Sequence, residues 1–120
     1  MKITVIHVAG EERPTPRALV NTPDDLGERM NAHLEYAFRW TQNINDSWSY
    51  GDGEDRNPNV QRLGPLHPAP RRGIRCTMVG DRMVVDGVTW VVAPKGFRNE
   101  TLGEPACEIE KLYVGGAIRL

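Results

Sequence analysis

The stretch from Val79 to Val92 constrains the fold more than any other part of this chain. Two runs rich in β-branched residues flank the dipeptide Asp86-Gly87. This dipeptide suits a two-residue type I′ turn, because both central positions of that turn need positive φ. The pattern predicts a β-hairpin with one apolar face. In the register set by the turn, Val85 faces Val88 and Met83 faces Trp90 on that face, while Arg82, Val84, Thr89 and Val91 share the other.

Other segments must cover the apolar face, because a lone hairpin is only marginally stable in water. Residues 2–8 are dense in β-branched side chains and predict a strand. Residues 73–79 have alternating character and predict a third strand. Residues 108–114 predict a final strand or a short helix. The polar, proline-containing residues 11–20 form either a loop or an exposed edge.

A helix over residues 22–42 is the natural cover for the hairpin. Thr22 suits the cap position and Pro23 the first helical position. Apolar residues then recur at spacings of three and four, which is typical of an amphipathic helix that packs on a core. This predicted stripe consists of Leu26, Met30, His33, Leu34, Ala37 and Trp40.

A long loop is predicted from about residue 46 to residue 71. Glycine and proline punctuate this stretch, and residues 52–57 are almost wholly polar. We expect Trp48 to anchor the start of the loop and the acidic residues after it to be mobile. The whole chain, residues 1–120, is expected to be one small α+β domain: a mainly antiparallel, twisted sheet of four or five strands with one principal helix.

Composition excludes several classes of function. The formal net charge of −1 and the pI near 6.3 give no global attraction to nucleic acid or to an anionic membrane. No apolar run is long enough to span a bilayer, and the N-terminus does not resemble a signal peptide. We therefore expect a cytosolic protein with no membrane partner, whereas the sequence leaves its oligomeric state open. The spacing of Cys76 and Cys107 favours two separate reduced thiols.

No cofactor or metal site is predicted. His7, His33 and His67 are scattered and show no ligand spacing. His33, on the apolar stripe of the helix, is expected to be a satisfied core residue. Cys76 beside Arg75 suggests a nucleophile, but alternation along a strand more simply buries it.

Two segments combine aromatic and polar residues in a way that suggests binding. The first follows the helix and the second precedes the hairpin. Their neutral donors and acceptors, two tryptophans and one charge pair suit the capture of a peptide or a base. Alternatively, the same groups cap the helix, tie the loop to the sheet and pin a turn through Arg75 and Asp81. The candidate residues are Trp40, Thr41, Gln42, Asn43, Trp48, Ser49, Arg75, Thr77 and Asp81.

The same two segments carry a resemblance. Residues 38–48 read FRWTQNINDSW, and residues 75–81 read RCTMVGD. This resembles the "FxxTQNIxxSW" and "RSTSVGD" segments of small proteins carried by phages and plasmids of high-GC, actinobacterial-type bacteria. The match covers residues 34–97. It departs at Cys76 and Met78, where small hydroxyl residues are usual, so no role of those hydroxyls is carried over.

The resemblance implies a phage or mobile-element accessory protein and no particular reaction. We expect a stoichiometric protein that binds a host macromolecule in the bacterial cytosol, with a host protein as the preferred partner. Nucleic acid is the alternative partner, through a basic patch of Arg62, Arg71, Arg72 and Arg75. The balanced total charge favours the simpler interpretation that Arg71 and Arg72 are a solvated loop edge.

Overall fold

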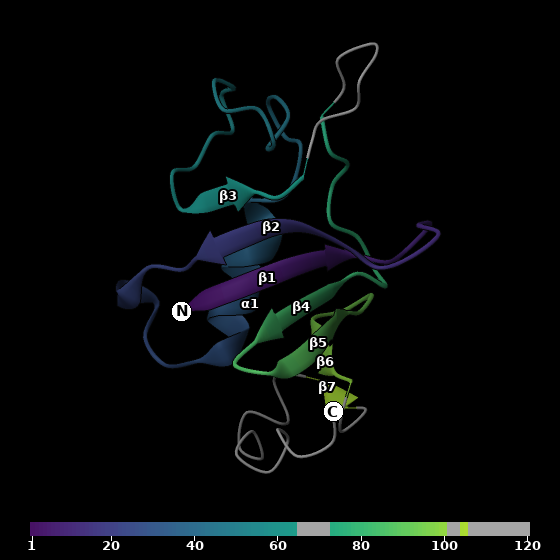
Figure 1. Ribbon diagram of the computed structural model, residues 1–120. Coiled ribbons are helices and arrows are strands. Elements are labelled where there is room, and N and C mark those ends of the chain that lie inside the picture. Colours follow the sequence, from purple (N-terminus) through teal and green to yellow (C-terminus); the bar gives the residue numbers. More distant parts are fainter. Residues whose placement is uncertain (65–72, 101–103, 106–120) are drawn as a thin grey trace.

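The computed structural model describes residues 1–64, 73–100 and 104–105. They form one antiparallel sheet with a helix across one face, so the predicted α+β class is confirmed (Figure 1). The strands lie in the order β3-β2-β1-β4-β5-β6-β7. The sheet is therefore larger than the four or five strands expected. The strands are β1 (Lys2–His7), β2 (Thr15–Asn21), β3 (Val60–Arg62), β4 (Arg82–Val85), β5 (Val88–Val92), β6 (Phe97–Asn99) and β7 (Glu104–Pro105).

The hairpin β4-β5 has the predicted register. Val85 pairs with Val88 and Met83 pairs with Trp90. The turn residue Asp86 has φ 49° and Gly87 has φ 80°, which is the left-handed conformation that a type I′ turn requires. β4 also pairs with β1, so the hairpin joins the sheet beside β1.

The helix is shorter than predicted. One 3-10 turn spans Asp24–Leu26, and α1 spans Met30–Arg39. Gly27, with φ 79°, separates the two, because this left-handed backbone conformation cannot continue a right-handed helix. Thr22 does not cap the helix; its hydroxyl instead lies 3.1 Å from the carbonyl oxygen of Met1.

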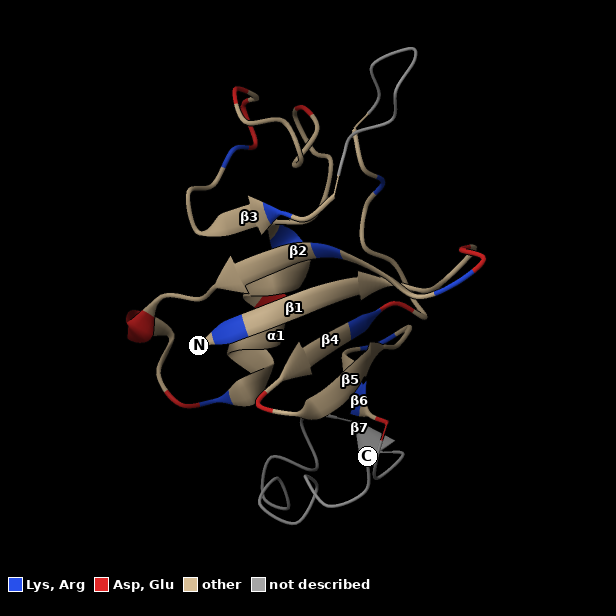
Figure 2. Ribbon diagram, in the orientation of Figure 1, with Lys and Arg blue, Asp and Glu red and all other residues tan. Residues whose placement is uncertain are grey.

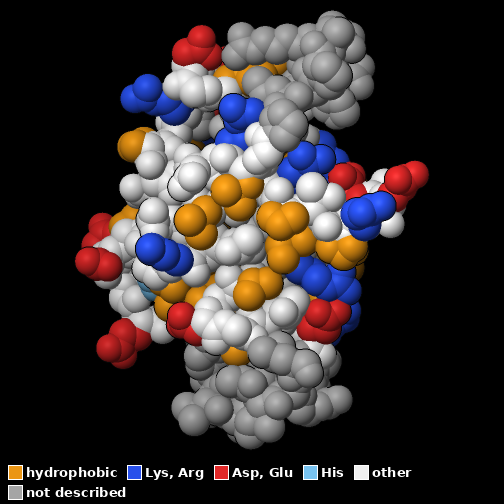
Figure 3. Space-filling model, in the orientation of Figure 1, with side chains coloured by type: hydrophobic (Ala, Val, Ile, Leu, Met, Phe, Trp, Pro, Cys, Tyr) orange, Lys and Arg blue, Asp and Glu red, His pale blue; other side chains and the backbone are white. Residues whose placement is uncertain are grey.

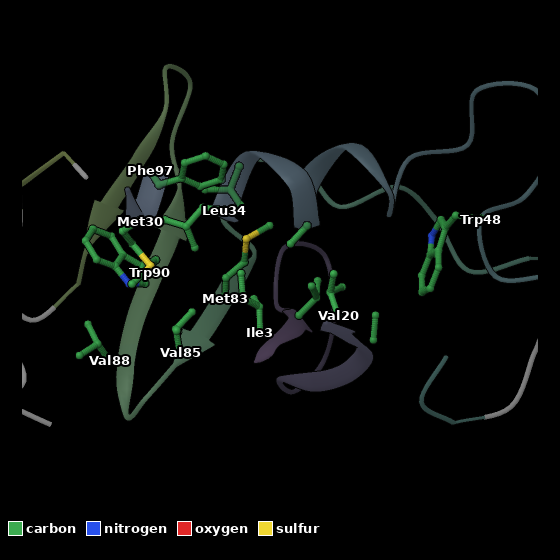
Figure 4. Packing of buried hydrophobic residues seen from close by; sticks show 14 of the residues in the cluster. Ile3, Val20, Met30, Leu34, Trp48, Met83, Val85, Val88, Trp90 and Phe97 are labelled. Atoms are coloured by element: carbon green, nitrogen blue, oxygen red, sulfur yellow. The ribbon is translucent and has the colours of Figure 1, made fainter. Parts of the chain in front are cut away.

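The apolar stripe of α1 covers the inner face of the sheet (Figure 4). Met30, Leu34 and Ala37 are buried against the sheet. Trp90 has no exposed surface. The core is a single cluster, and burial of its side chains is the main stabilising contribution to the fold. The strand residues that line it include Ile3, Val5, Ala18, Val20, Met83, Val85, Val88, Val92 and Phe97.

Two stretches differ from the sequence expectation. Residues 15–21 form β2, an internal strand rather than a loop or an edge. Pro16 is accommodated because it lies beside a register irregularity between Val5 and Ile6. Residues 60–62, inside the predicted long loop, form the short edge strand β3. The final strand or helix predicted over residues 108–114 lies outside the described residues.

Residues 73–79 are not a strand, contrary to the prediction. This segment runs along the end of the sheet, and its backbone groups bond mainly to side chains and to the helix exit. Ile74 N bonds to Ser49 Oγ, and Thr77 N bonds to Thr41 O. These partners replace a β ladder, so alternation in the sequence was a misleading signal here.

Candidate functional site

The two segments singled out in the sequence lie side by side at one end of the sheet. We call residues 41–49 and 73–81 together the frame. The first segment leaves the C-terminal end of α1, and the second leads into β4. Hydrogen bonds from Gln42, Asn43 and Trp48 reach the second segment. The sequence therefore correctly paired these segments as parts of one structure.

Arg75 and Asp81 form the charged centre of the frame. Arg75 Nη1 lies 2.7 Å from Asp81 Oδ2, and Arg75 Nη2 lies 2.9 Å from Asp81 Oδ1. The backbone amides of Val8, Ala9 and Met78 also donate to this carboxylate, at 2.7, 3.0 and 2.8 Å. Such an arrangement joins the end of β1 to the frame through one fully buried carboxylate.

The environment of Asp81 strongly favours its ionised form. Burial alone would raise the pKa of its carboxyl group. The hydrogen bonds from Arg75 and from the backbone amides outweigh this effect and lower the pKa from 3.8 to about 2. Arg75 also lies 3.5 Å from the Glu11 carboxylate, so its positive charge faces two acidic groups.

A buried chain of hydrogen bonds connects β1 to the helix exit. His7 Nε2 lies 3.1 Å from Thr77 Oγ1, and the Thr77 hydroxyl donates to Thr41 Oγ1 at 2.8 Å. Thr41 in turn donates to the carbonyl oxygen of Ala37 at 2.8 Å. Because the Thr77 proton is directed at Thr41, the proton of neutral His7 must lie on Nε2.

The pKa of His7 is lowered from 6.5 to about 4, mainly by burial and then by the positive charge of Arg75, while Asp81 opposes the shift. His7 is 1 % exposed and therefore remains neutral at physiological pH. The hydrogen-bond chain is closed off from solvent, so this histidine fastens the frame to β1. Nothing in the sequence distinguished His7 from other strand residues.

The side-chain amides of the turn after α1 make hydrogen bonds within the protein. Gln42 Nε2 donates to the carbonyl oxygens of Phe38 and Thr77, at 3.0 and 2.9 Å. Asn43 Nδ2 donates to Ile74 O at 3.2 Å, and Asn43 Oδ1 accepts the Trp48 amide at 2.9 Å. These contacts satisfy groups that the end of a helix otherwise leaves unpaired.

Trp48 and Ser49 fasten the start of the loop. The indole Nε1 of Trp48 donates to Arg75 O at 3.0 Å, and its ring is buried. Thus the expectation that Trp48 anchors the loop is confirmed. Gly73 is needed where the segments meet, because a Cβ at this position would fall 1.8 Å from Ser47 Oγ.

Asp55 makes a contact that the sequence did not reveal. Its Oδ2 accepts the backbone amides of Ile44, Asn45 and Asp46 at 2.8, 2.8 and 3.1 Å. The Asn45 side-chain amide donates to Oδ1 at 3.1 Å. These bonds, that of Asp46 foremost, lower the pKa of Asp55 to about 2 although burial opposes the shift. Asp55 is therefore fixed, whereas we expected the acidic residues of this loop to be mobile.

The candidate binding residues differ widely in exposure. Five of them are buried, and only Asn43 is classed as exposed. Trp40 is half-buried, with the Arg39 guanidinium 4.2 Å from its ring centroid. The buried candidates therefore support the frame from within. The buried five are Thr41, Trp48, Ser49, Thr77 and Asp81.

Three apolar side chains of the frame face solvent. Ile44 is 58 % exposed, Met78 is 47 % exposed and Val79 is 51 % exposed. They are three of the four large apolar side chains that are exposed among the described residues. Sequence reasoning missed them.

The basic patch of the nucleic-acid alternative is only partly described. Arg62 lies in the edge strand β3, where its Nη1 donates to Gly64 O. Arg75 is engaged by Asp81 and Glu11 as described above. Arg71 and Arg72 lie outside the described residues.

The other residues considered for catalysis or metal binding, His33 and Cys76, make hydrogen bonds within the protein. His33 Nδ1 lies 2.6 Å from Thr22 Oγ1, and His33 Nε2 lies 2.8 Å from Gly27 O. The expectation of a satisfied core histidine is confirmed. Cys76 Sγ accepts the Asn43 amide at 3.1 Å. No group of three or more potential metal ligands occurs within the described ranges.

Comparison with protein-family models, with curated proteins and with solved structures finds no match for this chain. Within residues 1–64, 73–100 and 104–105, no helix has the length and apolar character needed to cross a bilayer.

Proposed function

We propose that this chain is a non-enzymatic accessory protein of a phage or mobile element that binds a host protein in the bacterial cytosol. Its action would be stoichiometric, of the host-takeover or counter-defence type. The phage or mobile-element origin is supported by the sequence resemblance alone. The binding role is supported by one structural observation: three large apolar side chains of the frame, Ile44, Met78 and Val79, are exposed to solvent.

Rigidity matters for the energetics of binding. The side chains beneath the exposed residues are held by the Arg75–Asp81 pair, the His7–Thr77–Thr41 chain and the Asp55 contacts. A surface ordered in advance loses little conformational entropy when a partner docks. Exposed apolar groups on such a surface supply the favourable burial that protein interfaces use.

The local charges favour a protein over nucleic acid as partner. Arg75 is the only arginine or lysine in residues 73–81, and its guanidinium is bonded to Asp81 and close to Glu11. An arginine so engaged offers little to a phosphate backbone. The apolar side chains of the frame have no comparable internal use.

Affinity capture from bacterial lysate tests the proposal. The tagged protein is incubated with lysate that is either treated with nuclease or left untreated, and the captured material is identified by mass spectrometry. A specific host protein retained in both halves supports the proposed function. Loss of all captured material after nuclease treatment would instead favour the nucleic-acid alternative, with Arg62, Arg71 and Arg72 as the residues to replace.

A further inference from the structure

One face of the sheet packs against α1, and the other is apolar at its middle. Ile3 and Val5 are in the core, so Thr4 between them points outward. Residues paired across neighbouring strands share a face, so the partners of Thr4, which are Leu19 and Val84, are outward as well. A solvated sheet face normally carries polar residues at such positions. The positions here, which we call the open face, are Thr4, Ile6, Leu19, Val84, Thr89 and Val91.

No helix or strand of the described residues lies over the open face (Figure 1). Ile6, Leu19 and Val84 are half-buried, although only their neighbours in the sheet shield them. The space-filling view shows apolar side chains near the middle of this side of the molecule and charged side chains towards its margins (Figure 3). A contiguous apolar area of this kind is typical of an interaction surface.

The arginines beside the open face are already paired. The Arg82 guanidinium donates to both oxygens of the Glu100 carboxylate, at 2.7 to 3.1 Å. Arg17 Nη2 lies 3.7 Å from Glu11 Oε1. Figure 2 shows no charged residue along the middle of β2, β1 and β4. The centre of the open face is therefore neutral.

This charge distribution favours a neutral partner. Lys2 and Arg98 are exposed, but one lies at the start of β1 and the other in β6, away from the middle of the face. A nucleic acid needs several cations that are free to contact phosphates. A symmetric dimer needs a surface that complements its own copy. The open face has this property, because apolar groups pack on apolar groups and the hydroxyls of Thr4 and Thr89 can both donate and accept.

The size of the open face also suits a dimer. Strands lie about 4.8 Å apart and rise about 3.4 Å per residue, so β2, β1, β4, β5 and β6 offer roughly 400 Å² in projection. Two such faces, corrugated by side chains, bury on the order of 1,000 Å² in total, which is the lower limit for a specific interface. Sheets of equal twist stack face to face with their strands within about 30° of each other. We therefore expect a reversible dimer in the micromolar range.

We infer that this chain forms a symmetric dimer in which the open faces of two copies pack against each other. Ile6, Leu19 and Val84 provide the apolar contacts at the centre of the interface. The Arg82–Glu100 ion pair lies at its rim. The open face is a different surface from the frame, so the dimer does not depend on the proposed function.

Sedimentation velocity on the full chain tests the dimer. Between about 1 and about 500 μM the wild-type mass should rise from 13.5 kDa towards twice that value. Leu19→Lys with Val84→Lys puts like charges from both copies into the interface and should weaken the dimer at least about a hundredfold. Leu19→Thr with Val84→Thr, which only reduces the apolar surface, should weaken it about tenfold. Ile44→Lys with Met78→Lys, in the frame, is the matched control and should dimerise like the wild type.

Urea denaturation first establishes which variants are folded, and the threonine variant alone decides if the lysine variant is not. A single mass of 13.5 kDa over the whole concentration range overturns the inference. A dimer that the folded Leu19 and Val84 variants retain, or that the control also loses, overturns it as well. If the protein is monomeric, a lysate protein captured by the wild type but not by the threonine variant would be the partner that covers the open face.

Discussion

The Arg75 guanidinium and the Asp81 carboxylate form a two-point ion pair, with nitrogen to oxygen distances of 2.7 and 2.9 Å. Asp81 is fully buried, while the Arg75 side chain is 30 % exposed. The pair therefore links an inner carboxylate, which holds the end of β1, to the outer surface of the frame. The stability of this ion pair depends on every group that donates a hydrogen bond to the Asp81 carboxylate.

Replacing Asp81 should destabilise the whole domain. Asp81→Asn removes the charge that Arg75 faces and replaces one acceptor oxygen by a donor beside backbone amides. We expect a loss of about 2 to 4 kcal/mol in the free energy of unfolding, measured by urea denaturation. Asp86→Asn, in the exposed hairpin turn, makes the same chemical change and should be nearly neutral. An equal effect of both variants would contradict the role assigned to Asp81.

His7 should make the stability depend on pH. Its pKa is about 4 in the folded protein and 6.5 in the unfolded chain, so the unfolded state binds more protons between these values. Stability is therefore fully present above pH 6.5 and falls as the pH drops towards 4, by about 3 kcal/mol at most. Urea denaturation at several pH values measures this dependence.

The His7→Gln variant provides the comparison for that experiment. Glutamine retains an N–H donor near the position of Nε2 but does not titrate. The variant should lose the dependence between pH 6.5 and 4, apart from what other groups contribute. An identical slope in the variant would show that His7 does not titrate as described.

Asp55 should control local order near Ile44. Asp55→Asn weakens the bonds from the amides of residues 44–46, so hydrogen exchange at these amides should accelerate. Exchange in β1 and β4 should change little. Glu54→Gln, at the exposed neighbouring position, is the control. The ionised Asp55 carboxylate stabilises this contact fully above its unfolded pKa of 3.8. This stabilisation is lost as the pH falls towards the folded pKa of about 2. Unchanged exchange in Asp55→Asn would contradict the contact.

The hairpin turn offers a test of the fold. Gly87 has φ 80°, a conformation that costs an L residue roughly 1 to 2 kcal/mol. Gly87→Ala should lower the free energy of unfolding by about that amount. Gly51→Ala, where φ is not positive and nothing lies within 4 Å of the added Cβ, should have a small effect. The opposite ranking of the two variants would argue against the assigned turn.

Local signals predicted part of the fold well. The Asp86-Gly87 turn gave the β4-β5 register, because turn chemistry and alternation act over a few residues. The stripe of α1 likewise identified Met30, His33 and Leu34 as core residues. The helix start was wrong because Gly27 adopts positive φ, which the sequence permits but does not require. The internal strand β2 was not predicted, because Pro14 and Pro16 suggested a loop or an exposed edge.

The candidate site was predicted in outline only. The Arg75–Asp81 pair and the tie between the two segments were anticipated as the structural alternative. The contacts of His7 and Asp55 were not anticipated. His7 bonds to a residue 70 positions away in the sequence, and Asp55 bonds to residues 9 to 11 positions away, each through a single atom. Backbone amides that converge on a carboxylate leave no residue pattern in the sequence. Exposure of Ile44 likewise depends on the tertiary structure.

The central claim is that a host protein binds through the exposed apolar side chains of the frame. The most direct measurement compares capture from nuclease-treated lysate by the wild-type protein and by a variant with Ile44→Ser, Met78→Ser and Val79→Ser. A control variant carries Asn21→Ser, Asp24→Ser and Glu28→Ser, which are also exposed. Thermal unfolding first confirms that all three proteins are folded. We predict that the frame variant loses the captured protein while the control retains it; equal capture by all three would contradict the account.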